Sequence, residues 1–532
     1  MTLTSFFDKR LDGRSVLKTA LVLLKTDGTE EKYSWYDYRN KAIYIAEWLK
    51  RGGVQKGDFV AIIPLNLPES FSAMLGIILI GAVPVPINIH LLREKGLVDL
   101  RKIIGDCKPK FILINEFLRE FILGTGISCT VTEEIIIESK VTLSKFGPPL
   151  TKYCEDYPTA KINDLLIMPY TSGTSGQPKG VMLTHENVIN RLEAASSAFA
   201  ITKNERILSY LPLGHIAELI TTFFGQIYSG YTVYFTEYSK EILANRERFG
   251  KKFPSVLQQV QPTIFVAVPT IWTSFKNKVE TKIKNTPVLE KIPRWLKKFI
   301  IKRKLFRHAR VLISAGDKID KKYWKFFANL GIYISDIYGQ TETAGPLTVD
   351  GKVIGSNIKV DVNENGEITV VGDCVMARYY QNPSANAQAF TKNEAGEVVY
   401  HTGDTGIKDG EKIFWSGRIG DSGKMANGEF VTAERLYLLE EKIKKIDGDV
   451  EEVIVCFESK PHMTAMIFSK NYLDQNLKEK IRRELPKIGK GMYALRRFIL
   501  INSAELELTP TMKVKRKMML EKFASVIDSL YK

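Results

Sequence analysis

Short, uninterrupted apolar runs recur along the first three-quarters of the chain, and they constrain its fold more than any other feature. Stretches with helix-like spacing separate these runs from one another. The runs are FVAIIP from Phe59, KFILIN from Lys110, LLIMPY from Leu165, TVYFT from Thr232, TIFVAVP from Thr263 and RVLISAG from Arg310. Continuous runs of Val, Ile, Leu and Phe between helices are typical of largely parallel sheets that are covered on both faces. The sequence therefore predicts an α/β fold.

The pattern changes from Gly366 onward. GEITVVGDCVMARYY and GEKIFWSGR show shorter spacing between strands, with turn residues between them, which predicts a small β-rich subdomain. After Asp421 a turn and an amphipathic helix follow, and the tail alternates strand and helix again. A chain of 532 residues, 44% of them hydrophobic, is long enough for more than one domain. We therefore predict a large N-terminal domain over residues 1–418 and a small, mobile α+β domain over residues 419–532.

Several features favour a cytoplasmic protein. The N-terminus lacks an apolar core and a cleavage site of small residues, so we expect no secretory signal. The longest apolar stretch, residues 71–89, is long enough to span a bilayer, but it holds Gly76, Gly81, Pro84 and Pro86, and a helix followed by a buried strand explains it better. The five cysteines lack a Cys-x-x-Cys pair, which argues against a disulfide framework or a zinc site.

An excess of basic residues limits the kinds of partner. The chain carries 76 lysines and arginines against 60 aspartates and glutamates, a net charge of +16. This charge favours polyanionic partners, which are a charged cofactor, nucleic acid or an acidic membrane surface. The densest basic stretch, KIPRWLKKFIIKRKLFRHAR from Lys291 to Arg310, holds no acid. It is compatible with a segment that lies on a membrane surface, and equally with a solvated helix that has an apolar underside.

A loop of small and hydroxyl residues opens the stretch YTSGTSGQPKGVMLTHENV, Tyr170 to Val188. The apolar run before it predicts a strand, and Thr184 can cap a helix over residues 185–200, so we expect the loop to join a strand to a helix. Its amides and hydroxyls can donate hydrogen bonds to phosphate oxygens, and Lys179 adds a positive charge. The spacing matches neither a Walker A loop nor the dinucleotide Gly-x-Gly-x-x-Gly pattern. Taken alone, such a loop has the alternative of a flexible surface turn.

Polar groups also gather in later stretches of the chain. YGQTETAG, residues 338–345, offers an aromatic ring that can stack on a base and Glu342, a carboxylate for a magnesium ion. HTGD places Asp404 just after a tight turn, where it can accept both hydroxyls of a ribose or bond its own backbone. Arg418 follows at the predicted domain boundary, and LTPTMKVKR places Lys513 among hydroxyl and basic residues. Each stretch, taken alone, is more often structural than catalytic.

Taken together and in this order, the stretches resemble the adenylate-forming superfamily of acyl-CoA synthetases, firefly-luciferase-like enzymes and peptide-synthetase adenylation domains. The resemblance runs nearly end to end. It rests on GVQKGDFVAIIPLNLPES, YTSGTSGQPKGVMLTH, LPLGHIAE, YGQTET, HTGD and SGRIGD. LPLGHIAE, KMANGEFVTAER and ELTPTMKVKRKMMLEKF are more similar to long-chain fatty acyl-CoA synthetases than to acetyl-CoA or aryl-CoA enzymes.

The sequence departs from this family pattern at three places. Asp317 stands in SAGDKID where relatives usually have a small or apolar residue, which bears on the wall of the acyl pocket. Ala377-Arg378 replaces the glycine that is usual before the aromatic residue, and Gly420 stands where an aspartate or lysine usually forms the hinge. None of these departures removes a catalytic group.

The resemblance implies an ATP-dependent ligase that makes a fatty acyl-CoA in two half-reactions. In the first, the fatty acid attacks the α-phosphate of ATP, which releases pyrophosphate and leaves an acyl adenylate. In the second, the C-terminal domain rotates about Gly420 and the CoA thiol attacks the adenylate carbonyl. The implied catalytic residues are Lys513, which bridges carboxylate and α-phosphate, Glu342 and Thr174, which hold Mg²⁺, and His215, which lines the acyl and thiol site. From the residues alone, a packing histidine at a helix start is the alternative for His215.

The resemblance also assigns the contacts to ATP. The loop from Thr171 to Lys179 takes the β- and γ-phosphates, the turns at Tyr338 and at residues 314–316 take the adenine, and Asp404 with Arg418 takes the ribose. The full set of implied contacts is Thr171, Ser172, Gly173, Thr174, Ser175, Gly176, Lys179, Ser314, Ala315, Gly316, Tyr338, Gly339, Gln340, Thr341, Asp404, Arg418, Lys424 and Lys513.

The implied cofactors and substrates are ATP, Mg²⁺, coenzyme A and a fatty acid. We expect no nucleic-acid partner and a cytoplasmic location. The sequence is compatible with a homodimer and with a peripheral contact to an anionic membrane. Two other functions stay open. One is an acyl-AMP ligase that loads a carrier protein instead of CoA. The other is a non-catalytic, membrane-associated nucleotide-binding protein, against which the intact lysine, glutamate and aspartate set argues.

Overall fold

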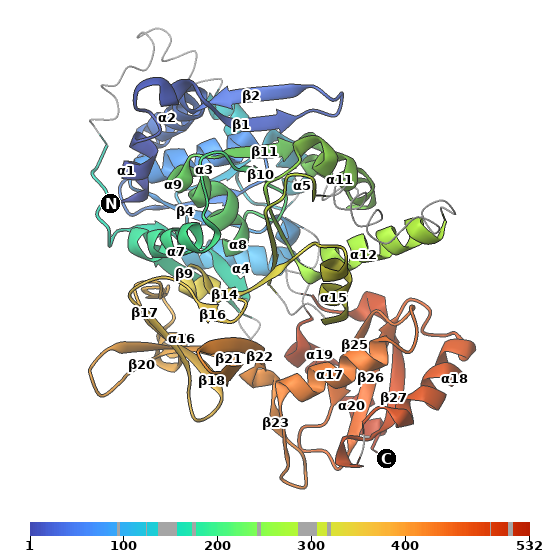
Figure 1. Ribbon diagram of the computed structural model, residues 1–532. Helices are drawn as coiled ribbons and strands as arrows, with labels where there is room; N and C mark the ends of the chain where they lie inside the picture. The colour runs from blue at the N-terminus through green and yellow to red at the C-terminus, as the bar shows by residue number, and fades with distance from the viewer. Residues whose placement is uncertain are drawn as a thin grey trace. The chain divides into compact units, whose positions relative to one another are not determined.

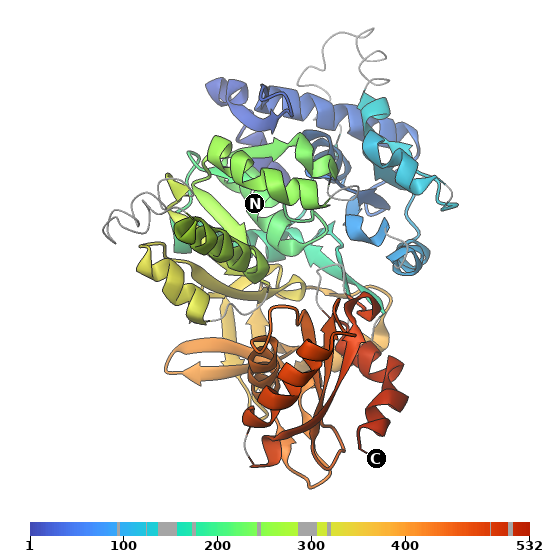
Figure 2. The same ribbon diagram turned by 90° about the vertical axis from the view of Figure 1, so that its right-hand side faces the viewer.

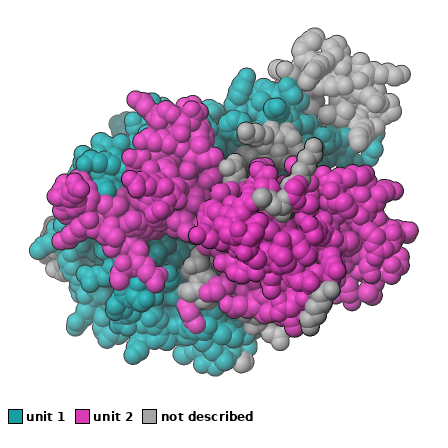
Figure 3. All heavy atoms as spheres, turned by 90° about the horizontal axis from the view of Figure 1, so that it is seen from below, with its two compact units in different colours: residues 1–171, 178–359, 371–386 teal, residues 172–177, 360–370, 387–532 magenta. Residues whose placement is uncertain are grey.

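The computed structural model describes residues 1–92, 96–123, 125–136, 157–172, 177–241, 246–285, 306–316, 321–489, 491–508 and 514–531. These residues fall into two compact units. Unit 1 comprises residues 1–171, 178–359 and 371–386, and unit 2 comprises residues 172–177, 360–370 and 387–532 (Figure 3). The two units divide the chain at positions other than Arg418, so the domain boundary at that residue stays a prediction.

One sheet of unit 1 is parallel throughout and has the strand order β4-β3-β5-β6. Its strands are β3 (Phe59–Ile63), β4 (Val83–Pro86), β5 (Phe111–Ile114) and β6 (Thr130–Val131). Helices α3 (Pro68–Leu79) and α4 (Leu97–Cys107) connect successive strands, and α2 (Trp35–Arg51) packs on α3. The stretch over residues 71–89 is therefore a helix followed by a strand, as predicted. In the part of the chain that the structure describes, no helix has the length and apolar character needed to cross a membrane.

A second sheet of unit 1 joins the start of the chain to a much later segment. It has the order β10-β11-β1-β2, formed by β1 (Thr19–Leu24), β2 (Glu30–Ser34), β10 (Arg206–Leu208) and β11 (Thr232–Thr236). β1 is antiparallel to β2 and parallel to β11, with Leu21 opposite Val233. These strands lie side by side in Figure 1. Every residue of β1 after Thr19 is buried, so this strand is part of the core.

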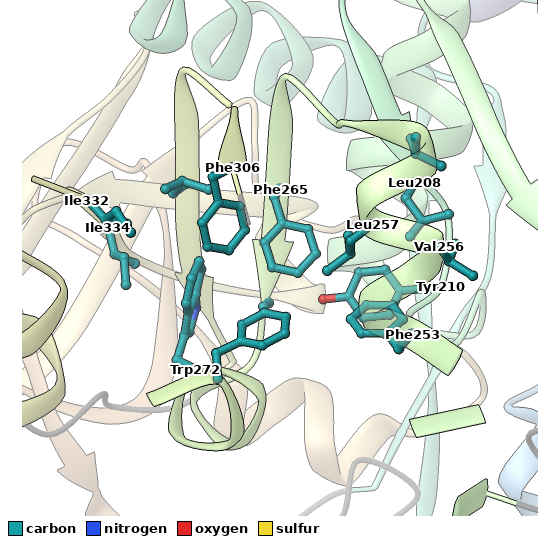
Figure 4. Packing of buried hydrophobic residues seen from close by; sticks show 14 of the residues in the cluster. Leu208, Tyr210, Phe253, Val256, Leu257, Phe265, Trp272, Phe306, Ile332 and Ile334 are labelled. Carbon is teal, nitrogen blue, oxygen red and sulfur yellow. The ribbon is translucent and has the colours of Figure 1, made fainter. Parts of the chain in front are cut away.

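Unit 1 continues with three parallel strands that lead into two antiparallel strands. The parallel strands are β12 (Ile264–Ala267), β13 (Val311–Ala315) and β14 (Ser335–Gln340), and the antiparallel strands are β15 (Gly345–Val349) and β16 (Lys352–Val353). A helix precedes each of the three parallel strands along the chain, and Figure 2 shows these helices from the side. They are α11 (Arg246–Val260), α12 (Pro269–Lys284) and α15 (Lys321–Asn329). An aromatic cluster fills the core between these elements (Figure 4). Phe265 lies between Tyr210 and Phe306, and the buried Trp272 donates a hydrogen bond from Nε1 to the Ile313 carbonyl at 3.3 Å.

The glycine-rich loop lies between two strands, and the expectation that it joins a strand to a helix was wrong. β7 (Leu165–Ile167) and β8 (Tyr170–Ser172) precede it, and β9 (Pro178–Thr184) follows before α7 (His185–Phe199) begins. β9 pairs with β7 on one side and with the distant strand β19 (Arg378–Tyr379) on the other. The predicted cap of α7 is confirmed, since Thr184 Oγ1 accepts a hydrogen bond from the Asn187 amide at 3.3 Å.

Antiparallel strands dominate unit 2 from residue 360 onward. They include β17 (Ile358–Val362), β18 (Glu367–Gly372), β20 (Phe390–Lys392), β21 (Val398–Asp409) and β22 (Lys412–Arg418). The prediction of a β-rich region from Gly366 is thereby confirmed.

The rest of unit 2 alternates strand and helix, as predicted. After the short pair β23 (Gly423–Lys424) and β24 (Phe430–Val431), helix α17 (Ala433–Lys444) packs on β25 (Glu452–Cys456). β26 (Met463–Ser469) pairs with β25 in antiparallel and with β27 (Leu495–Asn502) in parallel orientation, and α18 (Gln475–Glu484) connects the parallel pair. Helices α19 (Arg516–Lys522) and α20 (Ala524–Ser529) end the described chain.

Candidate active site

Glu342 lies where three distant segments of unit 1 meet. It belongs to a 3₁₀ turn, Thr341–Thr343, that directly follows β14. Its Oε1 accepts hydrogen bonds from the Tyr379 hydroxyl at 3.0 Å and from Thr171 Oγ1 at 3.4 Å, and its carbonyl accepts one from the Met376 amide at 2.8 Å. The first residue of the predicted phosphate loop and the predicted magnesium carboxylate are therefore adjacent.

Tyr379 links this carboxylate to the predicted phosphate-binding lysine. Lys179 Nζ lies 5.0 Å from the centre of the Tyr379 ring, a distance typical of a cation–π contact. Tyr379 was not among the predicted site residues. It sits on the short strand β19, where it pairs opposite Val181 of β9, so its place in the site depends on a long-range strand pairing.

The turn that holds Glu342 is tightly constrained. A side chain on Gly339 would collide with the carbonyl oxygen of Gly345, because β14 and β15 approach closely at this point. The buried Thr343 hydroxyl accepts the Gln340 amide at 3.1 Å and donates to the Gly345 carbonyl at 3.0 Å. Behind β15, the fully buried guanidinium of Arg191 donates to the Pro346 and Ile354 carbonyls, each at 3.1 Å. The backbone around Glu342 is therefore fixed from both sides.

The predicted adenine turn lies at the end of the neighbouring strand. Ser314 and Ala315 of β13 pair with Asp336 and Ile337 of β14, so both turns lie at the carboxyl edge of parallel strands, where α/β folds place ligands. Ser314 is fully buried, and its hydroxyl finds no hydrogen-bond partner among the described residues. Gly316 has a φ of +91°, a conformation that favours glycine. Asp317, one of the departures from the family pattern, lies outside the described residues.

His215 lies at the start of α8 (Ile216–Glu218), the position that both interpretations of this histidine predict. Its ring has a defined orientation. Nε2 lies 2.9 Å from the side-chain nitrogen of Asn88, whose Oδ1 accepts the His90 amide at 2.9 Å. Gly214 packs directly against Asn88 and leaves no room for a side chain. Asn88 was not predicted; the signal available was a polar residue two positions after an apolar strand.

Glu218, the last residue of LPLGHIAE, is a buried carboxyl beneath this segment. Its Oε1 accepts hydrogen bonds from Ser209 Oγ at 2.6 Å, Thr222 Oγ1 at 3.1 Å and Asn66 Nδ2 at 3.2 Å. Burial raises the pKa of Glu218 to about 7, although the hydroxyls of Ser209 and Thr222 act in the opposite direction. A six-residue π-helix, Leu219–Phe224, follows, a type of widened turn that is frequent at functional sites.

Asp404 and Arg418 form an ion pair inside unit 2. Arg418 Nε lies 2.9 Å from Asp404 Oδ1, and the two residues are opposite each other on β22 and β21. Asp404 is almost fully buried, whereas the arginine is half-exposed. The expectation of a tight turn before Asp404 was wrong, because HTGD lies within β21 and Gly403, with a φ of +68°, forms a bulge in that strand.

The remaining predicted residues fall into two groups, those that the structure describes and those outside the described residues. Lys424 is exposed on β23, and its carbonyl accepts the Ser459 amide at 2.8 Å. Tyr338, on β14, and Thr341, in the turn beside Glu342, are both half-buried. Outside the described residues lie Gly173, Thr174, Ser175, Gly176, Lys513 and residues 291–305 of the basic stretch. The roles assigned to all these residues stay predictions.

The described chain on either side of Lys513 is anchored within unit 2. Leu508 pairs with Val514 in an antiparallel bridge. Arg516 then forms a buried ion pair with Glu440 at 2.6 Å and donates to the Val455 carbonyl at 2.6 Å. These contacts fix the backbone that leads into and out of the segment with the predicted catalytic lysine.

Comparison with known proteins gives consistent results. The chain matches the family described as AMP-binding enzyme over residues 7–380. It is 27% identical to long-chain-fatty-acid–CoA ligase ACSBG2 of Homo sapiens, over 71% of this chain and 63% of that protein. It is 25% identical to long-chain-fatty-acid–CoA ligase 5 of Mus musculus, over 94% of this chain and 85% of that protein. The chain thus spans less than two-thirds of the human relative and most of the mouse one.

Solved structures share the fold. McyG A-PCP complexed with phenylalanyl-adenylate has a TM-score of 0.78 and 18% identity, over 100% of this chain and 85% of that chain. O-succinylbenzoate coenzyme A synthetase (MenE) from Bacillus subtilis in complex with AMP has a TM-score of 0.72 and 19% identity, over 97% of both chains. The predicted α/β architecture with parallel-rich sheets and a β-rich region is confirmed by these likenesses.

Proposed function

Because this chain belongs to the AMP-binding enzyme family, we propose that it is an AMP-forming ligase that joins a long-chain fatty acid to coenzyme A. The observation that carries the proposal is the cluster around Glu342. It brings the start of the phosphate loop, at Thr171, within 3.4 Å of a carboxylate oxygen, and Lys179 lies against the same tyrosine that bonds this oxygen. A carboxylate, hydroxyls and a lysine at one point suit a magnesium-bound polyphosphate.

The residues present fit a magnesium ion. Oε1 of Glu342 accepts two hydroxyl donors, while Oε2 takes no hydrogen bond from the described residues and can serve a hard cation. Glu342 and, by resemblance, Thr174 would hold the ion. When bound, it would neutralise charge on the phosphates of ATP.

The first half-reaction brings a carboxylate onto a polyanion, so its barrier falls mainly through positioning and charge neutralisation. In our proposal the loop from Thr171 to Lys179 holds the β- and γ-phosphates. Lys513 bridges the attacking carboxylate and the α-phosphate, where negative charge develops. Asp404, aligned by its ion pair with Arg418 at 2.9 Å, accepts the ribose hydroxyls. These contacts orient the α-phosphate toward the fatty acid.

The second half-reaction transfers the acyl group from the adenylate to the CoA thiol. His215 would line the acyl and thiol site, with its ring orientation set by Asn88 at 2.9 Å. The long-chain preference is supported by relatives named long-chain-fatty-acid–CoA ligases at 24–27% identity and by the similarity of LPLGHIAE to such enzymes. Loading of a carrier protein instead of CoA is the alternative acceptor that an experiment has to separate.

One assay tests the substrate class. ATP-dependent pyrophosphate release is measured across carboxylic acids from acetate to palmitate, together with an aromatic acid. Since each buried methylene contributes roughly 0.8 kcal/mol in an apolar tunnel, palmitate should exceed acetate in kcat/KM by a wide margin. Comparable efficiency with acetate or the aromatic acid would refute the long-chain assignment and leave only the family.

The acceptor is tested in the same reaction mixture. Palmitate and ATP are supplied with either CoA or a phosphopantetheinylated acyl carrier protein, and acylated products are resolved by mass spectrometry. We expect palmitoyl-CoA. Acylation of the carrier protein alone would refute the CoA assignment while retaining adenylation.

A further inference from the structure

Glu367 makes two hydrogen bonds to the residues directly before Asp404. Its Oε1 accepts the Gly403 amide at 2.9 Å, and its Oε2 pairs with Nδ1 of His401 at 2.9 Å. The Glu367 side chain is 13% exposed, and its own amide donates to Asn363 Oδ1 at 3.0 Å. Both oxygens of a largely buried carboxylate therefore hold the HTGD stretch. All of these residues belong to unit 2.

The strand pairing explains why a side chain is needed at this point. β18 and β21 pair at Glu367–Thr405 and again at Thr369–His401, so β21 uses more residues than β18 to cover the same length. The additional residues form a bulge in which Gly403 has a φ of +68°. A bulge interrupts the backbone hydrogen bonds of the ladder, and the Glu367 carboxylate supplies an acceptor to the Gly403 amide.

The register of this bulge determines where the Asp404 carboxylate lies. Successive side chains of a strand point to opposite faces, so a shift by one residue would move this carboxylate to the other face of the sheet. In the observed register Asp404 lies opposite Arg418, with 2.9 Å between Oδ1 and Nε. Thr402 adds to the restraint, because its hydroxyl accepts the Asp404 amide at 3.1 Å and donates to the Ile368 carbonyl at 2.7 Å.

We propose that Glu367 is a positioning residue that fixes the strand bulge at Gly403 and thereby presents the Asp404 carboxylate to the ribose hydroxyls of the nucleotide. The inference rests on the proposed function, which assigns the ribose to Asp404. Because the ribose does not react, its contact is made equally in the bound substrate and in the transition state. Loss of Glu367 should therefore raise KM for ATP and leave kcat nearly unchanged.

The test compares ATP with 2′-deoxy-ATP, which lacks one of the hydroxyls that Asp404 would accept. In pyrophosphate release, Glu367→Ala should raise KM for ATP about tenfold, as expected when a hydrogen-bonded partner is removed. It should also reduce the preference for ATP over 2′-deoxy-ATP toward unity. Glu367→Gln keeps an acceptor for the Gly403 amide and should restore a large part of this preference, and it also serves if the alanine variant does not fold.

Two comparisons separate positioning from general damage. Thr391→Val removes the hydroxyl that lies 2.8 Å from the other nitrogen of His401 and leaves both bonds of Glu367, so ribose preference should stay at the wild-type value. In an Asp404→Ala background, Glu367→Ala should cause no further loss of preference, because both changes remove the same contact. A folded Glu367→Ala protein with the wild-type ATP preference would overturn the inference.

A binding measurement separates this inference from the proposed reaction. Calorimetric titration with AMP and 2′-deoxy-AMP reports ribose recognition without turnover. Weaker AMP preference in the Glu367 variants would support the positioning role even if no acid released pyrophosphate, a result that would refute only the proposed function. Equal binding of the two nucleotides by the wild-type protein would overturn the positioning role.

Discussion

Replacing Glu218 by glutamine should flatten the pH dependence of stability. Glu218 is 2% exposed, and burial raises its pKa to about 7 from the ordinary value of 4.5. Because the folded state has the higher pKa, it binds the proton more tightly than the unfolded chain does. This contribution to stability is fully present below pH 4.5 and is lost as the pH rises through 7. A glutamine has a similar shape and does not titrate, so the variant should lack this loss.

The magnitude follows from the two pKa values. Their separation, 7 − 4.5 or 2.5 pH units, corresponds to about 3 kcal/mol of unfolding free energy. Roughly 2 to 3 kcal/mol of this should be lost between pH 5 and pH 8. Tyr210 is a titratable neighbour, and burial holds its pKa well above 10, so it does not contribute in this range.

The assay is urea denaturation followed by tryptophan fluorescence at several values between pH 5 and pH 8. The matched control is Glu193→Gln, which changes an exposed glutamate on α7. Wild type and control should both lose about 2 to 3 kcal/mol more over this range than Glu218→Gln does. The slope is the test, because the new amide also meets the amide donor of Asn66 and changes stability at every pH. Equal slopes in all three proteins would refute the reasoning.

Three further predictions concern the half-reactions. Lys513→Ala should lose adenylation, with a barrier raised by about 3 to 4 kcal/mol, and should retain thioester formation from supplied acyl adenylate. Single-turnover measurements in which both steps fall equally would contradict the role of Lys513 in adenylation. Glu342→Gln should raise the magnesium concentration needed for half-maximal rate more than Tyr379→Phe does, because Tyr379→Phe removes only one hydroxyl donor to the Glu342 carboxylate. If the two variants need the same magnesium concentration, Glu342 is structural. Gly420→Pro should preserve pyrophosphate release and block acyl-CoA formation. Gly420 lies in a 3₁₀ turn, where an added Cβ would meet open space. Wild-type rates of both steps in this variant would mean that the chain does not turn at Gly420.

The sequence predicted best those features that depend on neighbouring residues. The runs from Phe59, Lys110 and Thr263 form buried parallel strands, because a strand covered on both faces is apolar at every position. The cap at Thr184 was also predictable, since its partner Asn187 is three residues away. Such features need no knowledge of how distant segments pair.

Features that depend on distant pairing were missed. The place of Tyr379 in the site could not be found from local spacing, because Tyr379 pairs with Val181 far earlier in the chain. The bulge at Gly403 was misread as a turn for the same reason, since it exists only in relation to the register of β18. The proximity of Thr171 and Glu342 agrees with the roles that the family resemblance implied, but the contact itself required the structure.

The pairing of β1 with β11 has a consequence for how the chain is made. Leu21 lies opposite Val233, 212 residues later along the chain (233 − 21). At a synthesis rate of about 5 to 20 residues per second, roughly 10 to 40 s separate the translation of the two strands. During that interval β2 can cover one edge of β1, while the other edge of this apolar strand is a template for pairing with a second nascent chain. Ribosome speed and chaperone supply over the first two hundred codons should therefore govern the yield of folded protein.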